Sequence, residues 1–232
     1  KILMLSINNV FSPADGRPIC TPTQDIILGV SYMTKEKPHS VGEDRLFANA
    51  EEVIVAYEDK AVTLNARIKL RVEKVFDFEE KKVVTGRQII TTIVGKVLFN
   101  QVLPAEFGFV NKELNKTSVG DIVVECYKRF GHSATIILLD EIKRLGFEMG
   151  TLGGISIGID DLQIPKEKVE VLKETRLEVA KVEEQYHRGI ITDRERKAKV
   201  IDIWTHTTDK ISDLLFKSMA PFNPIFMMAD SG

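Results

Sequence analysis

Hydrophobic and polar positions in the middle of the chain alternate with a period of two. Hydrophobic residues there are separated by charged ones: Ile68, Leu70 and Val72 alternate with Lys69, Arg71 and Glu73. This alternation is typical of a strand with one buried face. Residues 83–84 and 88–91 can pair with it, and Gly86 is placed to form the turn. The pattern therefore predicts a small antiparallel sheet.

Helices are predicted on both sides of this sheet. They cover residues 48–60, 93–102, 118–130 and 133–146. Asn49 is suited to cap the first helix, and Pro104 closes the second. Ser118 and Ser133 can cap the last two, which Gly131 would join as a compact helical pair.

The segments before and after these helices are less regular. Residues 1–34 are rich in turn signals, and Pro18 and Pro22 exclude a continuous helix through them. Within this region, residues 26–30 predict a strand or a short buried element. Residues 150–158 contain several glycines that match no dinucleotide-binding motif, so we expect them to allow tight turns and close backbone packing.

A heptad pattern predicts two long helices in the last third of the chain. They cover residues 165–188 and 193–218, with Gly189 between them and a Thr192/Glu195 capping box at the second start. The apolar seam consists of Leu172, Thr175, Val179, Val182 and Tyr186, then Val200, Trp204, Thr207, Ile211 and Leu214. We predict an antiparallel hairpin roughly 35 Å long. Its surface charges favour a projecting rod, and a plain hairpin within a bundle is the alternative.

Composition and charge narrow the class of protein. The chain is 44% hydrophobic and 28% charged, as in globular proteins, and its net charge of −2 gives no general attraction for nucleic acid. No apolar run is long enough for a membrane span. Cys20 and Cys126 form no CxxC pair, so we expect a cytoplasmic protein without a disulfide framework or zinc site. The elements together predict a helix-rich α+β fold.

Few residues suggest chemistry. Asp160 and Asp161 could bind a divalent cation, but no third ligand is evident, and we expect them to accept hydrogen bonds from backbone amides. The four histidines are far apart. The hairpin tip is basic: it contains His187, Arg188, Arg194, Arg196, Lys197 and Lys199 against Asp193 and Glu195. The tip is either a docking point for an acidic partner or simply a solvated turn.

Several short segments resemble the largest catalytic subunit, β′, of bacterial DNA-directed RNA polymerase. In family order they are Leu3–Asn9, Ser12–Pro18, Pro22–Asp25, Ile27–Gly29, Val94–Lys96, Phe99–Asn100, Leu103–Pro104, Gly158–Asp161, Ile164–Pro165, Val200–Trp204 and Met227–Gly232. Each segment alone is weakly specific, but the ordered set is highly specific. The chain begins in mid-pattern without an initiator Met and ends on an apolar stretch, so we expect an internal piece of β′.

The resemblance implies a transferase subunit whose catalytic parts lie outside this chain. In the family, three aspartates of an NADFDGD motif hold the catalytic Mg²⁺, and this motif is absent here. The fragment is therefore expected to have no catalytic residue, metal site or cofactor of its own. Residues 1–160 resemble the pore region and residues 161–232 the funnel region, which line the secondary channel through which nucleoside triphosphates enter.

The resemblance also implies partners. These are the β, α, ω and sigma subunits, transcript-cleavage-type factors at the hairpin tip, and DNA, RNA and nucleoside triphosphates in the whole enzyme, but no membrane. The expected factor-docking residues are Tyr186, Arg188, Arg194, Arg196, Lys197, Lys199 and Asp202. Gln24, Met228 and Asp230 are expected near the active centre.

One ligand and two other functions stay open at this point. Asp140 and Lys199 match positions that contact a guanosine tetraphosphate alarmone in some relatives, whereas Arg144, Lys197 and Ala198 depart from that pattern. A stand-alone coiled-coil adaptor would have a gene that ends near Gly232. A metal-dependent phosphotransferase would use Asp160 and Asp161 and would bind Mg²⁺ or Mn²⁺.

Overall fold

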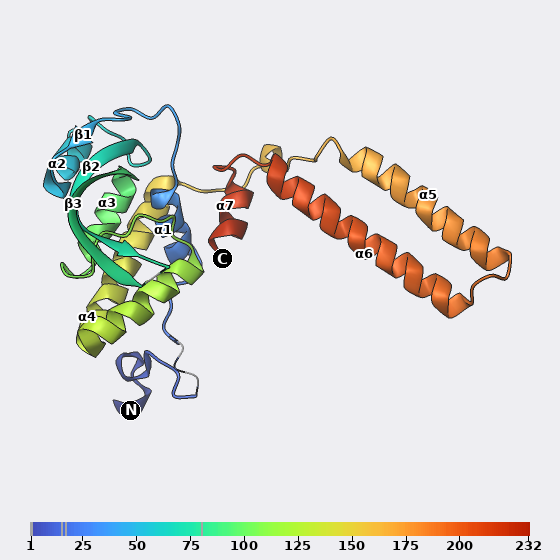
Figure 1. Ribbon diagram of the computed structural model, residues 1–232, viewed down its shortest axis with the longest axis horizontal. Helices are drawn as coiled ribbons and strands as arrows, with labels where there is room; N and C mark the ends of the chain where they lie inside the picture. Colours follow the sequence, from blue (N-terminus) through green and yellow to red (C-terminus); the bar gives the residue numbers. More distant parts are fainter. Residues whose placement is uncertain (1, 15, 17, 80) are drawn as a thin grey trace. The chain divides into compact units, whose positions relative to one another are not determined.

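The structure is a computed structural model that describes residues 2–14, 16, 18–79 and 81–232. It forms two compact units, Lys1–Ile155 with Met227–Gly232 and Ser156–Phe226. The sequence predicts a boundary after residue 160, and it does not predict that the last residues return to the first unit. The helix-rich α+β class is confirmed (Figure 1).

The first unit contains most of the elements. They are η1 (Ile2–Met4), η2 (Ser6–Asn9), α1 (Asp25–Thr34), β1 (Leu46–Phe47), α2 (Ala50–Glu58), β2 (Arg67–Asp77), β3 (Lys82–Ile93), α3 (Val94–Val102) and α4 (Lys116–Gly153). The second unit contains η3 (Ile159–Asp161), α5 (Lys168–His187) and α6 (Asp193–Ser218), and α7 (Pro224–Ser231) joins the two.

The sheet has the predicted strand pair and one further strand. β2 and β3 are antiparallel, whereas β1 pairs with β2 in parallel, so the sheet is mixed. Ile68, Leu70 and Val72 are buried, as the period of two predicted. The turn predicted at Gly86 is wrong, because Gly86 lies inside β3 and the chain turns after Asp77. Gly86 lies at the register shift between β2 and β3, where a strand glycine commonly marks a bulge.

Residues 26–30 belong to helix α1. The helix begins at Asp25, beyond the two prolines, and buries Ile27, Val30 and Met33 at a spacing of three residues. This spacing is helical, but it extends over too few residues to exclude a strand.

The predicted helical pair is confirmed, because the element labelled α4 consists of two helices that meet at a kink at Gly131. Gly131 has φ 79° and ψ −172°, which interrupts the helix. Asn115, rather than Ser118, caps the element, because its side chain accepts a hydrogen bond from the Ser118 N–H at 2.9 Å. The helix runs on to Gly153, beyond the end predicted near Gly146.

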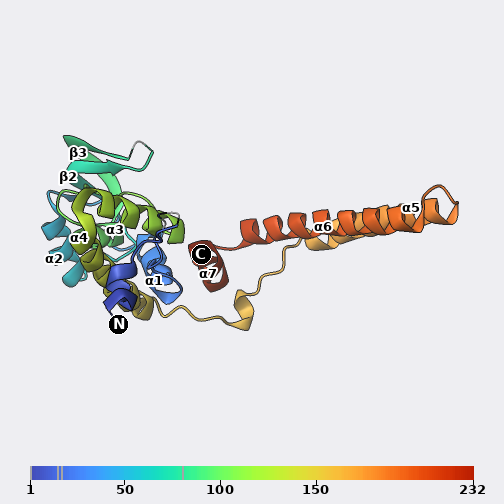
Figure 2. The same ribbon diagram turned by 90° about the horizontal axis from the view of Figure 1, so that it is seen from below.

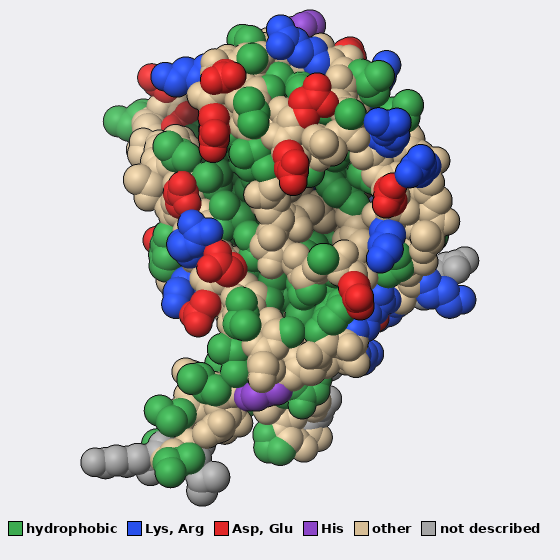
Figure 3. All heavy atoms as spheres, turned by 90° about the vertical axis from the view of Figure 1, so that its left-hand side faces the viewer, with side chains coloured by type: hydrophobic (Ala, Val, Ile, Leu, Met, Phe, Trp, Pro, Cys, Tyr) green, Lys and Arg blue, Asp and Glu red, His purple; other side chains and the backbone are tan. Residues whose placement is uncertain are grey.

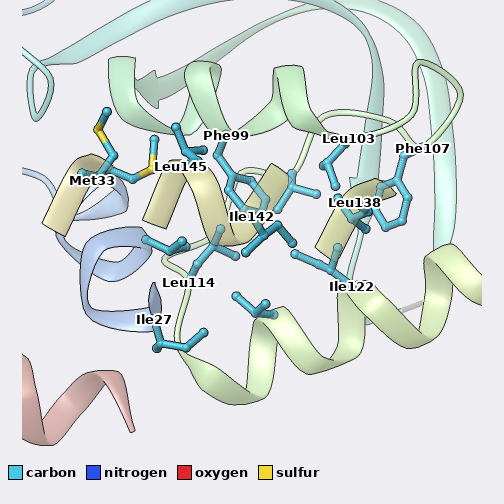
Figure 4. Close-up of a cluster of buried hydrophobic side chains, with 14 of the residues drawn as sticks. Ile27, Met33, Phe99, Leu103, Phe107, Leu114, Ile122, Leu138, Ile142 and Leu145 are labelled. Carbon is cyan, nitrogen blue, oxygen red and sulfur yellow. The ribbon is translucent and has the colours of Figure 1, made fainter. Parts of the chain in front are cut away.

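A core of buried side chains fills the space between α1, α3 and α4 (Figure 4). Its largest fully buried members include Ile27, Met33, Phe99, Phe107, Leu114, Ile122, Leu138 and Ile142. α1 and α4 approach closely where Gly29 meets Gly146 and Gly150. The expected role of the later glycines in close packing is confirmed at Gly150 and Gly153, which face α1.

The second unit is an antiparallel helical hairpin of α5 and α6 (Figure 2). Val171, Thr175 and Val182 of α5 and Thr207 of α6 are buried in the seam. The placement of Trp204 in the seam is wrong: it is 38% exposed, and the neighbouring Ile203 is more buried. The first helix begins at Lys168 rather than at residue 165. Projection of the hairpin stays a prediction.

Candidate functional site

Local hydrogen bonds shape the turn between α5 and α6. Gly189 has a positive φ of 72°, and the Ile190 N–H donates to the Gln185 carbonyl at 3.0 Å. The predicted capping box is confirmed, because the Thr192 N–H donates to Glu195 Oε2 at 2.8 Å and the Glu195 N–H donates to Thr192 Oγ1 at 3.3 Å. The tip is therefore an ordered turn that presents its side chains in a defined arrangement.

Acidic neighbours pair with half of the basic side chains at the tip. Asp193 accepts from Arg196 and Lys197, each at 2.8 Å, and Arg188 pairs with Glu184. Hydrogen bonds from Lys197 and then Arg196 lower the pKa of Asp193, and the Thr192 backbone lowers the pKa of Glu195. These carboxylates therefore stay ionised at neutral pH and reduce the positive charge of the tip.

The tip nevertheless offers a cationic and aromatic surface. The Arg196 guanidinium lies over the Tyr186 ring, 5.2 Å from its centroid, and Tyr186 is 37% exposed. Among the described residues, Arg194 forms no ion pair within 4 Å, and its side chain is exposed, as are Lys199 and Asp202. Arg194 and Lys199 are thus the cations most available to an acidic partner.

A second group of predicted residues lies where α7 meets α1. Gln24 precedes α1 with φ 53° and ψ −127°, a backbone conformation that costs energy for a residue with a side chain. Gln24 and Met228 line a small pocket of about 150 Å³ together with Asp25, Leu28, Ser231 and Gly232. Asp230 forms an ion pair with Lys35 at 2.9 Å. The structure thus places Gln24 and Met228 together.

Comparison with known proteins assigns the family. Residues 9–162 match the family model of RNA polymerase Rpb1, domain 3. The chain belongs to the RNA polymerase Rpb1, domain 3, family. Over its full length it is 45% identical to the DNA-directed RNA polymerase subunit beta' of Pelotomaculum thermopropionicum. It is 43% identical to that of Heliobacterium modesticaldum over 99% of the chain and 41% identical to that of Clostridium tetani over 100%.

The chain spans about a fifth of the length of these relatives, with 19%, 20% and 21% of each covered. The resemblance to β′ is confirmed by this similarity, which extends across both units. Similarity over the whole chain favours the polymerase hypothesis over a stand-alone adaptor. The roles of individual residues stay predictions at this level.

In this Rpb1 domain 3 chain, the residues considered for an alarmone lie on two elements. Asp140 is exposed on α4 and pairs with Lys143 at 2.7 Å, while Lys199 lies on α6. Arg144 pairs with Glu141 at 2.8 Å. Alarmone binding stays a prediction.

The hydrogen bond expected from a backbone amide to the adjacent aspartates is confirmed for Asp161. Asp161 Oδ2 accepts a hydrogen bond from the Gly158 N–H at 2.7 Å, and the Asp161 carbonyl accepts from Asn223 Nδ2 at 2.9 Å. Within residues 2–14, 16, 18–79 and 81–232, no three His, Cys, Asp or Glu side chains form a metal-binding group. In the same ranges, no helix combines the length and the apolar character needed to cross a membrane.

Two features of the Rpb1 domain 3 unit were not predicted. One is Lys35, which is buried and contacts Asp230 far along the chain. The other is a cavity of about 890 Å³ between α2, β2 and the end of α3, whose lining includes Leu70, Val72, Val97 and Leu103. Figure 3 shows hydrophobic side chains exposed among charged ones on one face of this unit.

Proposed function

We propose that this chain forms part of the secondary-channel wall of a bacterial RNA polymerase and does not itself catalyse nucleotidyl transfer. Similarity to β′ subunits along the whole of this chain supports the assignment to the polymerase. Catalysis and its Mg²⁺ then belong to other parts of the enzyme, and Gln24, Met228 and Asp230 lie near the active centre. The β, α, ω and sigma subunits, the nucleic acids and the nucleoside triphosphates are partners of the whole enzyme.

We infer further that the α5–α6 tip docks transcript-cleavage-type factors. The observation that carries this proposal is the ordered turn, which presents Arg194, Lys199 and the Arg196–Tyr186 stack at the end of two paired helices. An acidic surface on a factor would complement these cations. Such charges mainly affect the rate of association and its dependence on salt.

Charge reversal at the tip tests this proposal. In the complete polymerase, Arg194→Glu should weaken factor affinity by about three- to tenfold at low salt, since exposed charges contribute modestly. The effect should shrink as ionic strength rises. Lys181→Glu, which changes an exposed lysine on the α5 shaft, is the matched control and should have little effect. Equal affinities for all three enzymes, measured by fluorescence titration of a labelled cleavage factor, would contradict docking at the tip.

A further inference from the structure

We propose that Lys35 is a positioning residue. Through its ion pair with Asp230, it holds the last turn of α7 against α1 and so keeps Met228 beside Gln24. This inference rests on the proposed function, in which Gln24, Met228 and Asp230 lie near the active centre of the polymerase. Lys35 has no role in that proposal, and its ion pair would explain how Gln24, Met228 and Asp230 are held together.

Lys35 forms its ion pair with Asp230 from a largely buried position. Its side chain is only 8% exposed, and its Nζ lies 2.9 Å from Asp230 Oδ2. The Lys35 carbonyl accepts a hydrogen bond from Asn65 Nδ2 at 2.8 Å, which fixes the backbone from which the side chain extends. An ammonium group that is removed from water requires an anionic partner, so the position of Asp230 is coupled to this site.

α7 depends on such contacts for its own position. It has only eight residues, and a helix of this length is not stable in water without tertiary packing. Met227 and Ser231 are each 4% exposed, and Gly232 lies against the Lys116 side chain. The ion pair adds a directional contact to this packing, and it acts on the same turn as Met228.

Gln24, which directly precedes α1, is itself held in an unfavourable backbone conformation. Gln24 has a positive φ of 53°, and such backbone strain persists only where the surroundings maintain it. The Gln24 carbonyl accepts from the Leu28 N–H at 2.9 Å, which ties it to the first turn of α1. Since Gln24 and Met228 line one small pocket, movement of α7 would separate Met228 from the strained residue.

Lys35 and Asp230 are unequally buried, so substitutions of the two residues should have unequal effects. The Asp230 side chain is 50% exposed, whereas that of Lys35 is 8% exposed. Asp230→Ala leaves a buried ammonium without this anion, whereas Lys35→Met leaves a carboxylate that water can solvate. Removal of Asp230 should therefore be the more harmful change, and Lys35→Met should partly suppress it in the double variant.

The test uses the complete polymerase with Asp230→Ala, Lys35→Met, the double variant and the control Lys128→Met, which changes an exposed lysine on α4. Hydrogen exchange of residues 224–232 reports the position of α7, and the rate of single-nucleotide addition at saturating nucleotide reports function. Asp230→Ala should speed exchange and slow addition by about tenfold or more. The double variant should recover part of both, Lys35→Met alone should have a smaller effect, and Lys128→Met should resemble the parent enzyme.

The two readouts separate the inference from the proposed function. Unchanged exchange in Asp230→Ala, or a double variant no better than Asp230→Ala, would overturn the role of Lys35. Faster exchange with an unchanged addition rate would support the role of the ion pair in holding α7 and would contradict the proposed location of these residues near the active centre. If Asp230→Ala does not assemble, assembly restored by the additional Lys35→Met change supports the ion pair, and continued failure contradicts it.

Discussion

Gly29 shows how a single residue fixes the distance between two helices. A Cβ atom at this position would collide with the Gly146 carbonyl oxygen and would lie 2.7 Å from the Gly150 nitrogen. Because the obstacles are backbone atoms, they cannot move aside by changing rotamer. The glycines therefore let α1 lie directly on α4, and Gln24 and Lys35 flank the two ends of α1.

Gly29→Ala should destabilise the 232-residue chain by about 1–3 kcal/mol or more, because the two helices must separate. Gly120→Ala is the matched control: this glycine also lies in a helix, and a Cβ atom there would meet nothing within 4 Å. Alanine at this position should stabilise by up to about 1 kcal/mol. Urea unfolding measures both changes, and similar midpoints for the two variants would show that the contact is not tight.

Residues that act on their immediate neighbours could be predicted from sequence. The caps at Asn49 and Thr192 and the backbone role of Asp161 were predicted because each partner lies within three residues. The Lys35–Asp230 pair could not be predicted, since its members are 195 residues apart and neither residue type is unusual. Such a contact depends on how the helices pack.

At the scale of elements, the α5–α6 hairpin contains a buried polar contact. The hydroxyl oxygens of Thr175 and Thr207 lie 2.9 Å apart, and each also lies within hydrogen-bonding distance of a carbonyl one turn earlier, at Val171 and Ile203. Two hydroxyl protons cannot serve all three contacts. Only one backbone carbonyl can accept from these hydroxyls when the interhelical bond forms.

Replacement of both threonines by valine should therefore leave the stability unchanged or raise it by up to about 1 kcal/mol. Two apolar groups of the same shape replace a hydrogen bond whose net contribution is small. Thr205→Val with Thr208→Val is the control, since these threonines make the same local bonds but are exposed. Thermal unfolding measures both pairs. A loss of more than about 2 kcal/mol in the buried pair alone would mean that the polar contact is stabilising.

The heptad pattern predicted both helices of the hairpin but misplaced one seam position. Trp204 and Ile203 are adjacent, and spacings of three and four residues fit either of them. The structure buries Ile203 more deeply and leaves Trp204 partly exposed. A strongly periodic element is thus predictable from sequence, while the face that it buries is settled only by its partner helix.

At the scale of the whole molecule, two compact units share one family assignment. The family model matches residues 9–162, and the similarity to β′ subunits extends through the hairpin to the end of the chain. Ordered short segments carried the resemblance in the sequence. The mixed sheet and the return of α7 to the first unit could not be predicted, because β1 has only two residues and the position of α7 depends on distant contacts.

The most direct test of the account removes the hairpin from the complete polymerase. Residues 168–218 are replaced by a short Gly-Ser linker, which is feasible because the two ends of an antiparallel hairpin lie close together. RNA extension and factor-stimulated transcript cleavage are then measured on the same enzyme. The account predicts that extension persists and the response to the factor is lost. Loss of extension in the assembled enzyme, or a retained response to the factor, would contradict it.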